Sequence, residues 1–106
     1  MQILKSWVVC NMKNETTNLY LKTMIGAVYK ILPMYDNCDK TLHDYLDSLY
    51  VQLVGASEFY EELKHNQRFY SIINIIQYFR TNEFDKKTCK REVLKCTNTL
   101  DKLSKQ

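Results

Sequence analysis

Apolar residues recur at alternating steps of four and three, and this spacing constrains the fold more than any other feature of the chain. Such steps place the apolar residues on one face of an α-helix and the polar residues on the other. The longest unbroken run predicts a helix from about residue 40 to residue 64, and it passes through Leu42, Leu46, Leu49, Leu53, Ala56, Tyr60 and Leu63. Gly55 could break this helix, but the unbroken spacing favours continuity.

The same spacing recurs in three other segments. Pro33 is expected to end the first of them, because proline lacks an N–H and restricts the residue before it. Only two glycines and one proline occur in 106 residues, which also favours long helices. The three runs are Leu21, Ile25, Val28 and Leu32; Phe69, Ile72, Ile76 and Phe79; and Cys89, Val93, Cys96, Leu100 and Leu103.

The helix boundaries predict short connections. Asn66 and Asp85 can cap the third and fourth helices, the fourth spanning about 86–104, while Asp39 or Asn37 can cap the second. The connections would then lie near residues 33–38, 65–67 and 81–85, short enough to make neighbouring helices antiparallel. We therefore predict an all-α fold, an antiparallel up-down bundle of four main helices in a single domain spanning residues 1–106.

The N-terminal segment leaves two alternatives open. Ile3, Trp7 and Cys10 continue the apolar register, so residues 1–13 form either a short extra helix or a loosely attached extension. This segment is a poor secretory signal, and no apolar stretch reaches the ~18–20 residues that span a bilayer. We expect a soluble, cytoplasmic protein. Its abundant Lys, Asn, Ile and Tyr point to an AT-rich genome, either bacterial or that of a phage or large virus in an infected cell.

The stretch CKREVLKC resembles a chemical site, but its cysteines lie on the apolar stripe of the last helix. Seven residues of helix rise about 10.5 Å, whereas a disulfide needs Cα atoms within about 7 Å, so Cys89 and Cys96 cannot bond each other. Zinc-type paired spacings are absent from the sequence. Packing as small hydrophobic residues is the favoured interpretation. The alternative is that Cys10 and Cys38 each bridge to one of them.

Catalytic motifs are not found in the sequence. Glu62 and His65 match half of the ligand set of four-helix di-iron proteins, but that site needs a second such motif. The only other histidine, His43, has Lys40 rather than a glutamate three positions before it. We therefore predict no catalytic residues, no metal site and no cofactor, and we expect that the chain is not an enzyme.

Two sets of residues are candidates for contact with a partner. Val51 and Val54 lie opposite the apolar stripe of their helix, and Tyr70, Asn74 and Tyr78 line up away from the stripe of the next helix. Exposed tyrosines of this kind are typical of protein interfaces. Internal packing under the N-terminal segment is the equally weighted alternative.

The last helix also carries a basic face, formed by Lys87, Arg91, Lys95 and Lys102. This face can bind an anionic partner such as nucleic acid, or it can be an ordinary solvated helix face. The net charge of only +3 favours the second interpretation, as does the acidic outer side of the second helix.

The function predicted from these features is that of a small non-enzymatic protein–protein interaction module. It would be a regulator, inhibitor or immunity-type protein of a bacterium, phage or other mobile element. Its partner would be another protein molecule. A second copy of the same chain, which would give a homodimer, is one possibility. The alternative is an accessory protein that binds nucleic acid through the basic face. Nucleic acid is the less favoured partner. No motif ties the chain to a family.

Overall fold

The structure is a computed structural model that describes the backbone of residues 2–105 and the side chains of residues 15–105. Its helices are α1 (Gln2–Tyr29), α2 (Ile31–Asp36), α3 (Leu42–Phe59), α4 (Gln67–Thr81) and α5 (Lys86–Ser104), with a short 3₁₀ helix, η1 (Glu61–Leu63), after α3. The described residues form no strand, and 84% of the chain is helical. The predicted all-α fold is therefore confirmed.

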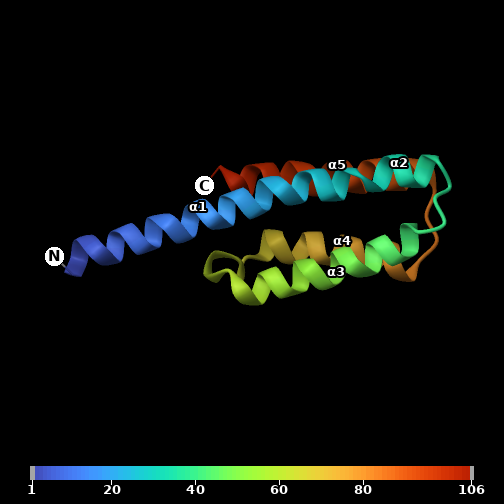
Figure 1. The fold of residues 1–106 in the computed structure, drawn as a ribbon. Helices are drawn as coiled ribbons and strands as arrows, with labels where there is room; N and C mark the ends of the chain where they lie inside the picture. Colours follow the sequence, from blue (N-terminus) through green and yellow to red (C-terminus); the bar gives the residue numbers. More distant parts are fainter. Residues whose placement is uncertain (1, 106) are drawn as a thin grey trace.

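The helices lie in two pairs (Figure 1). Helix α1 packs along α5, α3 packs along α4, and α2 follows α1 along the same side of the molecule and also contacts α5. The α2–α3 and α4–α5 connections lie at one end, and the α3–α4 connection lies at the other end. The first part of α1 extends past the other helices, and the whole molecule measures 56 × 21 × 20 Å.

One apolar core lies between the two pairs of helices. Each of the five α-helices contributes to it, and residues without any exposed surface include Val28, Ile31, Leu53, Phe69 and Cys96. Burying a side chain of the size of leucine or phenylalanine contributes about 1.5–3 kcal/mol. Two tyrosines add contacts between α1 and α3: the Tyr45 hydroxyl donates to the Ala27 carbonyl, and the Tyr20 ring lies 5.0 Å from that of Tyr60 just after α3.

The sequence predicted that Pro33 would end the first helix, and this prediction is wrong. The break comes earlier, at Lys30, and Pro33 lies in the first turn of α2. Proline is tolerated there because the N–H groups of a first turn need no partner in their own helix, whereas its ring would clash with the Tyr29 carbonyl if α1 continued unbroken. Lys30 keeps helical angles (φ −60°, ψ −20°), so α1 and α2 follow each other with only a local interruption.

The predicted C-terminal end of the second helix, at about residue 64, is also wrong. Helix α3 passes through Gly55 without a break but stops at Phe59, and Tyr60 adopts an extended conformation (φ −89°, ψ 120°). Glu61 and Glu62 follow directly, and negative charge is unfavourable at the C-terminal end of a helix, although Lys64 pairs with Glu61 (3.1 Å). The 3₁₀ turn still delivers Leu63 to the core.

Two of the three predicted caps are confirmed. The Asn66 side chain accepts a hydrogen bond from the Phe69 N–H (3.1 Å), and the Asp85 side chain accepts one from the Thr88 N–H (2.8 Å). The predicted cap of α3 is wrong, because Thr41 is the capping residue and it makes no side-chain cap bond. Asp39 instead closes a turn before the helix by accepting bonds from the Thr41 N–H (2.8 Å) and hydroxyl (2.6 Å). The same bonds lower the pKa of Asp39.

Residues 2–13 belong to α1, so they do not form a separate short helix. The side chains of Ile3, Trp7 and Cys10 lie outside the described residues. Among the helices of residues 2–105, none has the length and hydropathy needed to cross a membrane.

Candidate interaction surfaces

The two valines of α3 have different environments. Val51 is 67% exposed, one of the most exposed large apolar side chains among residues 15–105. Val54 is half-buried and packs against the core. Val54 therefore contributes in part to the packing of the bundle, whereas Val51 faces solvent.

The three residues singled out on α4 all have exposed side chains. Tyr70, Asn74 and Tyr78 are spaced four residues apart and so share one side of the helix. The Tyr70 hydroxyl donates to the Lys64 carbonyl at 2.5 Å, which holds this ring against the turn before α4. Because α3 packs along α4, one pair of helices carries all five residues, and we call this set (Val51, Val54, Tyr70, Asn74 and Tyr78) the α3–α4 surface.

A polar cluster that the sequence did not predict joins α3 to α4. Arg80 donates from Nε to Asp47 Oδ1 (2.8 Å) and from a terminal nitrogen to Gln77 Oε1 (2.6 Å). Its guanidinium also lies over the Tyr50 ring, 4.3 Å from the centroid. The hydrogen bond from Arg80 is the largest cause of a lowered pKa at Asp47. The cluster therefore links α3 to α4.

The basic residues predicted on α5 are all exposed. Lys87, Arg91, Lys95 and Lys102 make no ion pair with a carboxylate of residues 15–105. Two other lysines of the segment are paired: Lys86 lies 3.7 Å from Asp36, and Lys105 lies 3.1 Å from Asp101. The structure therefore leaves the four predicted cations available on the outside of the bundle.

The cysteines of α5 lie in the core. Cys89 and Cys96 are buried free thiols, which confirms the packing interpretation for both. Desolvation raises the pKa of Cys89 to about 11 and that of Cys96 to about 12, so both remain protonated near neutral pH and are poor nucleophiles. Cys38 is exposed and free in the α2–α3 connection, and the Cys10 side chain lies outside the described residues.

Glu62 and His65 have different surroundings in the structure. Glu62 Oε2 accepts a hydrogen bond from the Thr17 hydroxyl at 2.8 Å and so links η1 to α1, while His65 is exposed in the following turn. Within the part of the chain whose side chains are described, no three His, Cys, Asp or Glu residues are grouped so that they could hold a metal ion.

No protein-family model matches the chain, and comparisons with curated proteins and with solved structures found no similar protein. A proposal for its function therefore has to come from the surfaces described above.

Proposed function

We propose that the protein is a small non-enzymatic protein–protein interaction module that binds its partner through the α3–α4 surface. The observation that carries this proposal is the exposure of Val51 (67%) on a helix pair that also presents Tyr70 and Tyr78. A branched apolar side chain in water contributes little to the stability of the isolated chain. Tyrosines are enriched among the residues that dominate binding energy at interfaces.

The surroundings of this surface suggest the chemistry of the partner. Residues 42–63 contain five acidic residues and no lysine or arginine. Asp44 and Glu58 are exposed on the same helix as Val51. The partner would then have an apolar centre with basic residues around it. A two-fold homodimer through this surface would bring like charges from the two copies together, which favours a different protein as partner.

A module of this size would act by occupying a surface of its partner. We place it among regulators, inhibitors or immunity-type proteins of a bacterium, phage or other mobile element, acting in the cytoplasm of the bacterial or infected cell. Binding of this kind requires no nucleophile, general base or metal ligand on the chain.

The test compares two aspartate substitutions at equally exposed sites. Val51 on α3 and Leu19 on α1 are both 67% exposed, so Val51→Asp and Leu19→Asp introduce the same charge at equally exposed sites. Leu19→Asp is the more costly change for its helix, because leucine is the better helix former, and it is therefore a stringent control. A photo-crosslinking amino acid is placed at 51 or at 19 in cells that produce the protein, and the adduct is identified by mass spectrometry. We expect a specific adduct from position 51.

The captured protein is then titrated against purified variants. Val51→Asp should weaken binding about tenfold or more, while Leu19→Asp should stay close to wild type. Tyr78→Ala should also weaken binding, and circular dichroism checks that each variant is folded. Equal affinity of Val51→Asp and wild type would contradict the proposal, as would equal loss in the two aspartate variants. Sedimentation equilibrium of the wild-type chain determines whether the adduct is a second copy.

A further inference from the structure

Charge is separated between two parts of the molecule. Residues 86–105 hold seven basic and two acidic side chains, a net charge of +5, whereas residues 42–63 hold five acidic and no basic ones. Five of the seven cations make no ion pair with any described carboxylate, namely Lys87, Lys90, Arg91, Lys95 and Lys102. The modest total of +3 therefore hides a strongly basic helix.

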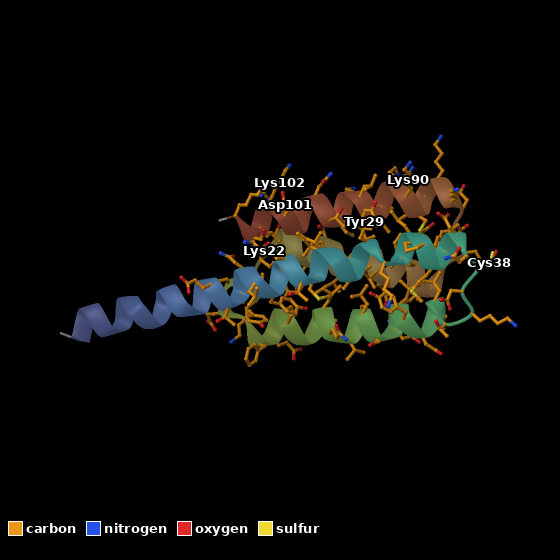
Figure 2. The ribbon with its side chains drawn as sticks, turned by 45° about the horizontal axis from the view of Figure 1, so that its top comes forward. Lys22, Tyr29, Cys38, Lys90, Asp101 and Lys102 are labelled. Atoms are coloured by element: carbon orange, nitrogen blue, oxygen red, sulfur yellow. The ribbon has the colours of Figure 1, made fainter. Side chains whose placement is uncertain are left out.

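Helix α1 adds to this basic surface. Lys22 is exposed on α1, which packs along α5, and Tyr29 near the end of α1 is 52% exposed. Figure 2 shows Lys22, Tyr29, Lys90 and Lys102 distributed along the two helices. By helical rise the unpaired cations of α5, from Lys87 to Lys102, span about 22 Å. Lys90 lies at Tyr29, and the other unpaired cations of α5 continue from it across the outer side of that helix. We call the unpaired cations of α5 together with Lys22 and Tyr29 the α1–α5 surface.

A hollow of about 430 Å³ lies at one end of this surface, where α1, α2 and α5 meet. Tyr29, Leu32 and Tyr35 line it together with Lys86, Lys90 and the Asp36 carboxylate. Asp36 pairs with Lys86 (3.7 Å), so Lys90 is the unpaired charge at the hollow. Tyr35 is held in place, because its hydroxyl donates to the Phe84 carbonyl (2.9 Å) and its ring stacks on that of Phe84. Tyr29 has about half of its surface free, so a planar group could stack on its ring at the end of the row of cations.

We propose that the α1–α5 surface binds single-stranded nucleic acid, with phosphates along the α5 cations and a base in the hollow against Tyr29. A row of cations beside an accessible aromatic ring is the arrangement by which proteins bind single strands, whose bases are free to stack. In a duplex the bases are stacked on one another and cannot reach Tyr29. Insertion into an anionic membrane would need the apolar side of α5, which is buried in the core.

The first test measures binding of a fluorescein-labelled oligothymidylate of about 20 nucleotides to the full chain by anisotropy, up to about 100 μM protein. If four cations each neutralise one phosphate, the affinity should fall about 50-fold between 50 and 200 mM salt. Absence of binding at 50 mM salt, or binding that does not depend on salt, would overturn the proposal. Equally tight binding of a duplex of the same length would overturn the single-strand assignment.

Matched variants test the location of the site. Arg91→Glu with Lys95→Glu should weaken oligonucleotide binding more than tenfold, while Lys40→Glu with Arg68→Glu, which changes the net charge equally at exposed sites off the surface, should have a much smaller effect. Tyr29→Ala should weaken it about tenfold, whereas Tyr78→Ala should not, although both tyrosines are exposed.

Equal losses in the two charge-reversed pairs, or equal effects of the two tyrosine changes, would overturn the assignment to this surface. Polyglutamate of matched charge should compete poorly with the oligonucleotide, because it offers no ring to stack on Tyr29. Effective competition would instead identify an acidic protein as the occupant. The α3–α4 surface is tested separately by Val51→Asp, so failure of either proposal can be recognised without the other.

Discussion

Arg80 links the two helices that carry the proposed binding surface. It contacts Asp47 and Tyr50 on α3 and Gln77 on its own helix, and only about a quarter of its side chain is exposed. Hydrogen bonds that involve a charged group are stronger than neutral ones, and the planar guanidinium can also interact with the tyrosine ring. Arg80 therefore stabilises the relative position of α3 and α4.

The lowered pKa of Asp47 predicts how this contact depends on pH. The hydrogen bond from Arg80 favours the charged carboxylate in the folded chain, so its folded pKa lies below the unfolded value of about 3.9. Its stabilising effect is complete above the unfolded value and is lost as pH falls through the folded pKa. Asp47→Asn should therefore lower the urea midpoint at pH 7, and the difference from wild type should shrink below about pH 4.

The control for this prediction is Asp44→Asn on the same helix. Asp44 is exposed and makes no ion pair with the described residues, so its substitution removes only the favourable placement of a negative charge in the first turn of α3 and should lower the midpoint less than Asp47→Asn does. A difference between wild type and Asp47→Asn that stays constant down to pH 3 would contradict the interpretation.

At this scale, local contacts were predictable from the sequence and distant ones were not. The caps Asn66 and Asp85 bond to N–H groups three residues ahead, so the residue type and its place before an apolar run are enough to find them. Asp47 and Arg80 are 33 residues apart, and nothing in either segment alone indicates their pairing. Tyr29 was not singled out because its place beside the hollow depends on the packing of α1 against α2 and α5.

Helix ends were harder to predict than helices. Periodicity located at least part of every long helix because the buried face repeats over many residues, and α5 was predicted with its observed bounds. The first half of α1 was not predicted as part of one continuous helix. The ends of α1 and α3 depend on local events: the Pro33 ring acts on the turn before it, and the chain leaves α3 at the extended residue Tyr60 while the apolar spacing continues. A pattern of apolar positions contains neither event.

Gly55 provides a test of the continuity of α3. It lies within the helix at an exposed position, and a Cβ added there would meet no atom within 4 Å. Gly55→Ala should therefore stabilise the protein by up to about 1 kcal/mol, because alanine is the better helix former. The measurement is the urea midpoint of unfolding, with Gln52→Ala on the same helix as a control that should change it less. A lower midpoint for Gly55→Ala would mean that α3 does not continue through this residue.

The two helix pairs of the molecule carry different surfaces, one apolar and acidic and the other basic. The α3–α4 pair presents Val51 and two tyrosines beside acidic residues, and the α1–α5 pair presents unpaired cations. A net charge of +3 had made the basic face look like an ordinary solvated surface, because a total charge contains no information about where charges lie. The packing of α1 beside α5 adds Lys22 and Tyr29 to that face, which the sequence of α5 alone could not indicate.

Both proposed surfaces depend on one claim about the whole bundle: α5 directs its cysteines into the core and its cations outward. The most direct test is alkylation by N-ethylmaleimide followed by peptide mass spectrometry, in native buffer and in urea, without reductant. The account predicts that exposed Cys38 reacts in the native protein, whereas buried Cys89 and Cys96 react only after unfolding. Reaction of Cys89 or Cys96 in native buffer as fast as Cys38, or resistance of either in urea because of a disulfide, would contradict it.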